Sequence, residues 1–255
     1  RVTAPINNDL TTTFRYNYKE VDYTSDNKDA LSQPYVNVVN GSPWLISSVS
    51  NTLSYNTLDT AILPHEGIAA SLTQELAGLG GDSDYYKLSG RVRGFYTVSD
   101  EQDIIASLAG SAGHMLSTRG KSLNVFDQFQ IDSNDIRGFA DTGIGTRMKK
   151  NDDPLGGTTY FTASAEVTFP LPGLSPDAGF RGGFFMDAGT LYGNEVKGAK
   201  DKEEGSDDLH LRAAAGASLI WASPFGPLRV DYAVPFMKED YDIVQRLKFG
   251  ISTSF

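Results

Sequence analysis

The chain has 255 residues with 22 Lys and Arg against 32 Asp and Glu, which gives a net charge of −10 at pH 7. This acidic balance argues against nucleic acid as a partner, because binding to phosphate backbones relies on clustered Lys and Arg. The absence of Cys excludes disulfides and a thiol nucleophile. No stretch approaches the roughly 18 consecutive apolar residues of a membrane helix. Residues 1–5 lack the features of a signal peptide, so we expect a chain that is mature or cut from a longer protein.

Period-two alternation recurs along the chain, and this spacing is typical of strands with one apolar face. It is clearest in residues 160–169, where one face is apolar and the other mostly polar: Phe161, Ala163, Ala165, Val167 and Phe169 against Tyr160, Thr162, Ser164, Glu166 and Thr168. We predict ten strands, near residues 10–23, 44–57, 67–78, 84–98, 102–115, 157–169, 178–192, 209–222, 226–236 and 244–255. Residues 1–5 are expected to end an earlier strand, and residues 35–39 to form a short strand inside a loop.

The connections between these strands alternate in length. Those near residues 99–102, 170–177 and 223–226 are short, whereas those near 24–43, 117–156 and 194–208 are long. Short turns on one side and long loops on the other are typical of a transmembrane β-barrel, and the strands reach the roughly 9–11 residues that cross a bilayer at a tilt. The sequence therefore predicts an all-β fold, an antiparallel transmembrane β-barrel forming a single domain over residues 1–255, with a long inserted loop at about 116–156.

A soluble β-sandwich or barrel is the competing interpretation. Its apolar face would be an ordinary core, and its outer surface would carry the charged residues of the strands, such as Arg15, Lys87, Arg229 and Lys248. Alternation alone does not separate the two folds. Strand length and loop asymmetry favour the membrane barrel.

A motif in the longest loop, Asp135-Ile136-Arg137-Gly138-Phe139, precedes the Glu166 strand and a segment from Gly182 to Gly189. In this combination the sequence resembles the barrel of the outer-membrane barrel-assembly translocases, the BamA-like family, whose sixth extracellular loop carries a Val/Ile-Arg-Gly-Phe/Tyr motif. The resemblance covers roughly residues 44–255. It extends to residues 221–228, to residues 231–235 and to the terminal Phe255.

The resemblance implies that the loop motif Arg137, Gly138 and Phe139 folds back into the lumen, where Arg137 meets Glu166 and Asp187. Strand parity supports this placement independently, because Glu166 lies on the polar face of its strand and Asp187 lies on the face opposite three lipid-facing residues, Phe184, Met186 and Ala188. A guanidinium can satisfy two carboxylates through its fork of donors. The simpler alternative is a turn arginine in solvent and two pore-lining acids.

By the same resemblance, the chain folds and inserts β-barrel proteins into the outer membrane of a Gram-negative bacterium. A seam between the first and last strands would open sideways, and a client strand would pair with the exposed edge. The implied partners are outer-membrane lipids, unfolded β-barrel clients and periplasmic accessory lipoproteins. The end of the chain is expected to carry a C-terminal assembly signal formed by Leu247, Phe249, Ile251 and Phe255.

The chain departs from the family in two respects. The periplasmic repeats that family members carry ahead of the barrel are absent from it, and ten strands fall short of the expected sixteen. A two-partner-secretion translocator, which shares the loop motif, and a passive porin or surface antigen remain alternatives. His114 and His210 could be rim histidines of an outer-membrane hydrolase, and His65 is expected in a short turn, but none of the three lies in a nucleophile or metal motif. We therefore expect no enzymatic activity, no cofactor and no metal.

Overall fold

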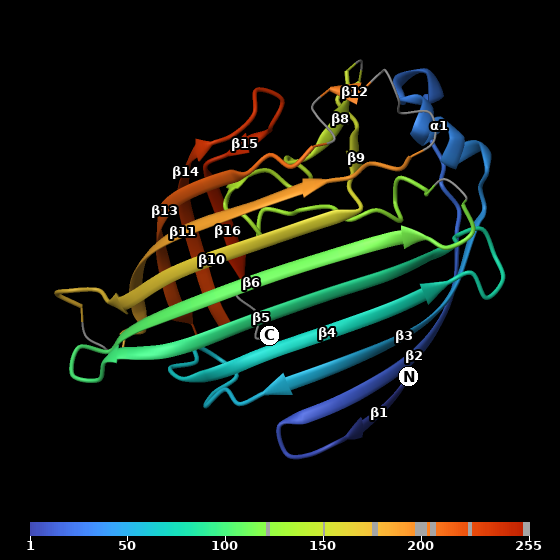
Figure 1. The fold of residues 1–255 in the computed structure, drawn as a ribbon. Coiled ribbons are helices and arrows are strands. Elements are labelled where there is room, and N and C mark those ends of the chain that lie inside the picture. Colours follow the sequence, from blue (N-terminus) through green and yellow to red (C-terminus); the bar gives the residue numbers. More distant parts are fainter. Residues whose placement is uncertain are drawn as a thin grey trace.

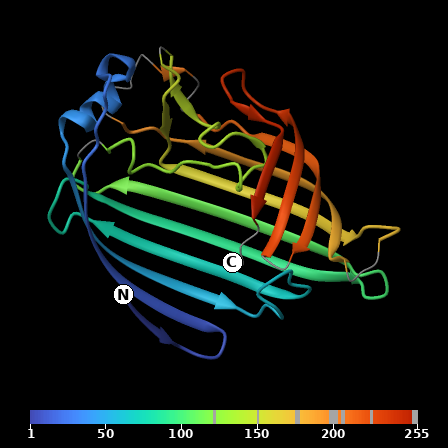
Figure 2. The same cartoon turned by 180° about the vertical axis from the view of Figure 1, so that it is seen from behind.

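Eleven antiparallel strands form one curved sheet in which each strand pairs with its neighbours in sequence order (Figure 1). The computed structural model describes residues 1–120, 123–149, 151–174, 178–196, 203–204, 208–223 and 226–251. The strands of the sheet are β1 (Val2–Pro5), β2 (Leu10–Val21), β3 (Trp44–Asn56), β4 (Gly67–Ala77), β5 (Tyr85–Ser99), β6 (Ile104–Ser117), β10 (Thr159–Pro170), β11 (Phe180–Tyr192), β13 (Arg212–Ser223), β14 (Gly226–Met237) and β16 (Leu247–Ile251). The view from behind shows the same sheet curving around a concave side (Figure 2). The predicted antiparallel all-β architecture is confirmed, and residues 2–5 do form a strand.

The two faces of the sheet follow the predicted alternation. On β11, Phe184 is 65% exposed on the convex face, whereas Phe185 and Asp187 are buried on the concave face. On β10, Val167 points outward and Glu166 is buried. Apolar side chains at a convex surface suit lipid, and they leave the polar face toward the lumen. In the part of the chain that the structure describes, no second sheet packs against these outward side chains, and many of them are exposed, which excludes the sandwich interpretation.

The strand lengths and connections match those of a membrane barrel. The nine strands from β2 to β14 contain 11–15 residues each, enough to cross a bilayer at a tilt. The connections at one end of the strands are residues 6–9, 57–66, 100–103, 171–179 and 224–225, and those at the other end are residues 22–43, 78–84, 118–158, 193–211 and 238–246. Within the described residues, no helix has the length and hydropathy required to span a membrane.

The strand predicted at residues 35–39 is wrong, because these residues lie in the helix α1 (Gln33–Asn40). Ser32 is extended ahead of the helix and Pro34 occupies its first turn, where a proline ring already has a helical φ. Val38 is buried in a cluster with residues of the long loop. The β-branched residues therefore adopt the helix that this packing and the N-terminal proline favour, against their intrinsic strand preference.

The final strand begins later than predicted, at Leu247 and not at Val244. Val244 and Gln245 form a separate strand, β15, that pairs with the long loop and not with the sheet. Among the residues described after residue 245, Leu247–Ile251 pairs with β14. Residues 252–255, including the predicted signal residue Phe255, lie outside the described residues.

The long loop between β6 and β10 crosses the concave side of the sheet (Figure 1). It contains β7 (Gly138–Phe139), β8 (Thr146–Met148) and β9 (Pro154–Gly156), and β8 also pairs with β12 (Glu203–Glu204). A 3-10 turn at Lys28–Ala30 precedes α1. The loop has apolar clusters of its own against the sheet, the largest formed by Ile131, Ile136, Phe139, Ile144, Leu191 and Ala214. Such burial offsets part of the conformational entropy lost in ordering a loop of this length.

Candidate functional site

The candidate site lies on the concave face, where the turn at residues 132–137 meets β10 and β11. Arg137 follows Ile136, which is fully buried, and its guanidinium is carried into the lumen. Gly189 on β11 makes room for this turn, because a Cβ there would lie 2.6 Å from the Ile136 side chain. A small residue in the strand thus lets the loop approach the sheet closely.

Arg137 binds Asp187 through three donors. Its backbone N–H and its Nε donate to Asp187 Oδ2 at 3.0 and 2.7 Å, and its Nη2 donates to Oδ1 at 2.7 Å. Its Nη1 donates to Glu166 Oε2 at 3.2 Å. Ser164 Oγ, which donates to Asp187 Oδ1, accepts a further bond from Nη2. The structure therefore brings the predicted Arg137, Glu166 and Asp187 into direct contact.

The strength of these ion pairs and hydrogen bonds depends on how far they are buried. Arg137 is 8% exposed and its two carboxylate partners are still less exposed, and its guanidinium carbon lies 3.4 Å from the centre of the Phe185 ring. Burial disfavours the charged guanidinium, but the hydrogen bond and charge of Asp187, together with Glu166, outweigh it and raise the pKa of Arg137. The arginine thus remains a cation in a low-dielectric site, where losing a partner costs about 3–5 kcal/mol.

A second arginine, which the sequence analysis did not place in the site, shares Glu166. Arg229 of β14 donates from Nη2 to Glu166 Oε1 at 2.6 Å and from Nε to Asp231 Oδ1 at 2.7 Å. Ser218 of β13 donates to Asp231 Oδ1 at 2.5 Å. The alternation of side chains along β14 places Arg229 and Asp231 on the luminal face. Only the registers of three successive strand pairs, from β10 through β11 and β13 to β14, show that they meet Glu166. Two guanidiniums and three carboxylates thus form one network that joins the loop to β10, β11 and β14.

The other two residues of the loop motif fix its backbone. Gly138 has a φ of +96°, and a Cβ at this position would lie 3.1 Å from Ala214 Cβ and 3.2 Å from Ala233 Cβ. Phe139 is buried in the apolar cluster of the loop. Glycine is required here both for the backbone conformation and for the close approach to the wall.

The first half of the loop has a separate polar anchor at Asp127. Ser83 Oγ lies 3.0 Å from both carboxylate oxygens of Asp127 and itself accepts a bond from Trp44 Nε1. Lys87 donates to the Asp127 carbonyl at 2.7 Å. Burial raises the pKa of Asp127 to about 6, although the bond from Ser83 opposes this shift.

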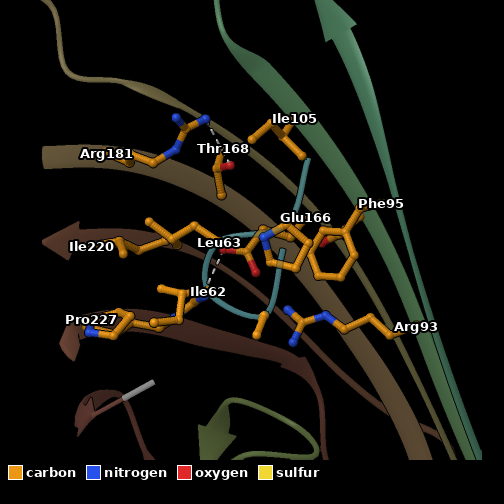
Figure 3. A pocket seen from close by; sticks show the side chains of 14 residues that line it. Ile62, Leu63, Arg93, Phe95, Ile105, Glu166, Thr168, Arg181, Ile220 and Pro227 are labelled. Carbon is orange, nitrogen blue, oxygen red and sulfur yellow. Dashed lines mark hydrogen bonds and ion pairs between the residues drawn. The ribbon is translucent and has the colours of Figure 1, made fainter. Parts of the chain in front are cut away.

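Beneath the arginine network lies a small cavity of about 70 Å³. The turn at residues 57–66 contributes Ile62 and Leu63 to its lining, and Figure 3 shows Leu63 beside Glu166, with Arg93 and Phe95 nearby. A cavity of this size holds a few waters and not a substrate. Glu166 and Arg229 of the network form part of its lining.

The remaining predicted residues lie elsewhere. Leu247 and Phe249 are exposed on the convex face of β16, and only the backbone of Ile251 is described. The histidines lie apart from the arginine network: His65 is 3.2 Å from Asp103, His210 is 3.1 Å from Glu239, and His114 bonds Thr159. In the described part of the chain, no group of three or more His, Asp or Glu could hold a metal ion.

The sequence and the fold were compared with those of known proteins. The sequence matches the Omp85 superfamily domain over residues 1–255. The chain belongs to the Omp85 superfamily. It is an integral β-barrel protein of the bacterial outer membrane.

Two relatives of this Omp85 chain are named for roles in assembly. Outer membrane protein assembly factor BamA of Neorickettsia risticii is 36% identical over 211 residues, which cover 83% of this chain and 28% of that protein. The sorting and assembly machinery component 50 homolog of Homo sapiens is 29% identical over 230 residues, covering 83% of this chain and 46% of that protein. The Omp85 chain therefore spans less than half the length of either relative.

A solved structure shares the fold. The crystal structure of BamA from Haemophilus ducreyi lacking POTRA domains 1-3 matches with a TM-score of 0.77 and 22% sequence identity, covering 99% of this chain and 53% of that chain. At this identity the likeness concerns the barrel fold.

Proposed function

We propose that this chain is the membrane-embedded part of a machine that folds and inserts β-barrel proteins into the bacterial outer membrane. The observation that carries the proposal is the buried Arg137, held by Asp187 and Glu166, in an Omp85 chain whose relatives include an assembly factor. In this proposal Arg137, Gly138 and Phe139 with Glu166 and Asp187 act as a loop lock. The lock holds the long loop across the lumen and stiffens the strands nearest the end of the chain.

The route to assembly is strand pairing and not covalent chemistry. Within the described residues, β16 pairs with β14 on one side only. The backbone N–H and C=O groups of an unpaired edge can bind an incoming strand, with main-chain bonds supplying affinity and alternating side chains supplying register. Unfolded β-barrel clients are the partners that this mode fits, with outer-membrane lipids around the apolar convex face.

Three further parts of the proposal concern the full-length protein. The eleven strands are the C-terminal portion of a sixteen-stranded barrel that forms a single domain with its long loop. Periplasmic accessory lipoproteins act with it. Leu247, Phe249, Ile251 and Phe255 form the signal by which the barrel is itself recognised for insertion, and the outward positions of Leu247 and Phe249 support this role.

Replacing Arg137→Ala in the full-length protein tests the function. In cells depleted of the native protein, we expect the variant to reach the membrane but to lower the yield of folded client barrels. Arg15→Ala is the matched control, because Arg15 lines the open part of the lumen together with residues of β2, β3 and β4. Unchanged client folding together with a stable ion conductance in Arg137→Ala would instead support the passive porin. Secretion of one dedicated partner, with normal client folding, would support the two-partner-secretion translocator.

A further inference from the structure

The connection from β14 to the last strand, residues 238–246, is held by a second buried ion pair. Arg212, at the start of β13, is 1% exposed, and its Nε and Nη2 donate to the two carboxylate oxygens of Asp242 at 3.0 and 3.1 Å. Nη2 also donates to the Tyr241 hydroxyl at 3.0 Å, and Nη1 to the His210 carbonyl at 2.8 Å. Asp242 Oδ2 accepts a further bond from the Glu239 N–H at 2.8 Å. The guanidinium thus binds Asp242 and Tyr241 in the connection and the backbone just before β13.

The opposite side of the same connection is held by the long loop. Val244 and Gln245 pair with Phe139 and Gly138. The Ala140 N–H donates to the Ile243 carbonyl and the Ile243 N–H donates to the Gly143 carbonyl, both at 2.9 Å. The residues directly after Asp242 are therefore part of a small sheet built on the loop motif.

A third contact reaches β16 itself. Lys248 Nζ donates to Asn134 Oδ1 in the turn that carries Arg137. Residues 238–248 are thus connected to β13 through Arg212, to the loop backbone through β15, and to the loop turn through Lys248. The last strand enters the sheet only after passing between these supports.

The last strand needs such support because its own pairing specifies register weakly. In its described part, residues 247–251, five residue pairs join it to β14, from Tyr232 with Leu247 to Leu228 with Ile251. A slip of one residue would exchange the two faces, but a slip of two would keep apolar residues toward lipid, so alternation does not oppose it. In a strand hairpin the connection fixes the register. Here that connection is long and requires anchors.

We propose that Arg212 and Asp242 are positioning residues that fix the connection before β16 and thereby set the register of the last strand against β14. The pair acts together with the β7 and β15 backbone pairing, so the loop lock and the last strand move as one unit. If the edge of β16 captures clients, this unit presents that edge in one register, and this consequence rests on the proposed function. The positioning role of Arg212 and Asp242 does not rest on it.

Residues 1–255 contain no Cys, so cysteine pairs engineered here meet no native thiol of this chain, and they can read the register in the full-length protein in its membrane. The Ala233 N–H donates to the Arg246 carbonyl, so Val230 and Phe249 form a pair of the non-hydrogen-bonded class, whose Cα atoms are close enough for a disulfide. Val230→Cys with Phe249→Cys reports the observed register. Val230→Cys with Leu247→Cys reports a slip of two residues.

In Arg212→Gln and in Asp242→Asn, we expect the first cross-link to fall about tenfold relative to the parent and the second to appear, because one buried partner is left unpaired. The swap Arg212→Asp with Asp242→Arg should restore the first cross-link. Arg181→Gln is the matched control, since Arg181 pairs with Asp103 at the short-turn end of the strands and should leave both cross-links unchanged. An unchanged first cross-link in both single variants overturns the proposal.

If Arg212→Gln does not form a folded, heat-modifiable barrel, the swap decides the question. Recovery of the folded barrel without recovery of the Val230–Phe249 cross-link would overturn the proposal, and recovery of both would support it. Client folding, measured in the same strains, separates this inference from the proposed function. A register shift with normal client folding would uphold the positioning role and count against assembly through this edge.

Discussion

The concave surface has two regions that differ in what covers them. On β10, β11 and β14, the luminal acids are buried under the long loop and bound to two arginines. On β2, β3 and β4, the luminal side chains line an open hollow of about 350 Å³: Thr13, Arg15, Asn17, Ser48, Ser50, Thr52, Thr73 and Glu75. Both regions follow the same period-two pattern. The difference shows that the luminal face of a strand becomes a site only where another segment removes it from water.

The energetic consequences differ accordingly. In the covered region, charges interact at low dielectric and each partner is needed to offset the desolvation of the others. In the open region, hydroxyl groups exchange bonds with water, so that a bond such as the one between Thr52 and Thr73 contributes little net stability. Substitutions in the two regions should therefore differ in size even where the side chains removed are similar.

Charge reversal gives the largest expected difference. Arg137→Glu places a third carboxylate beside Asp187 and Glu166 and should cost about 5 kcal/mol or more of loop stability, since loss of one buried partner alone costs roughly 3–5 kcal/mol. Limited proteolysis of the loop in the full-length protein measures this, and client folding should fall with it. Arg15→Glu in the open region should leave both measurements near the parent values.

Adding Asp187→Arg to Arg137→Glu tests whether the contact is direct. Partial recovery of loop protection is expected, because the swapped pair can form one salt bridge although it cannot reproduce the backbone bond from residue 137. Loop protection equal to the parent in Arg137→Glu alone would show that the lock does not hold the loop.

The backbone of the loop motif should be nearly as sensitive. Gly138→Ala combines an unfavourable positive φ, worth about 1–2 kcal/mol, with overpacking against Ala214 and Ala233, worth about 1–3 kcal/mol. Gly80→Ala is the control, since Gly80 has a φ of +106° with no atom within 4 Å of an added Cβ. The difference between the two variants in urea unfolding of the detergent-solubilised protein isolates the packing cost. Equal losses would show that Gly138 matters only for its φ.

The Asp127 anchor predicts a dependence on pH. Burial raises its folded-state pKa to about 6, above the unfolded value near 3.9, so the folded state binds the proton more tightly. Its contribution to stability is fully present below pH 4 and is lost as the pH rises through 6, a change of about 2–3 kcal/mol. Asp127→Asn should remove this slope from urea unfolding measured between pH 4 and 7. The opposite slope in the parent, attributable to Asp127, would contradict the burial argument.

The smallest expected effects compare single hydroxyl groups. Ser164→Ala removes a partly buried hydroxyl that donates to the buried Asp187 and accepts from the buried Arg137, and it should cost about 1–3 kcal/mol. Thr73→Val removes the bond to Thr52 in the open region and should cost less than about 0.5 kcal/mol. Urea unfolding of both variants under one condition checks the contrast. A larger loss in Thr73→Val would show that the open region is more constrained than its exposure indicates.

The sequence by itself determined the strands, their order and their faces. The alternation in the strands that carry Glu166 and Asp187 can be read from neighbouring residues alone, because successive side chains of a strand point to opposite sides. The long-loop and short-turn ends follow from chain lengths between these segments. The contact of Arg137 with Glu166 and Asp187 was expected from family resemblance together with parity, since neither acid is near Arg137 in sequence.

Only the tertiary structure decided the features that depend on competition between distant segments. Residues 35–39 form a helix because Val38 packs against the long loop, and residues 244–245 leave the last strand because the backbone of Gly138 and Phe139 pairs with them. Arg229 enters the arginine network, and Arg212 binds Asp242, through registers that no local pattern encodes. Each of these features depends on which groups from distant segments are buried together. The fold determines this, and the local sequence around each residue does not.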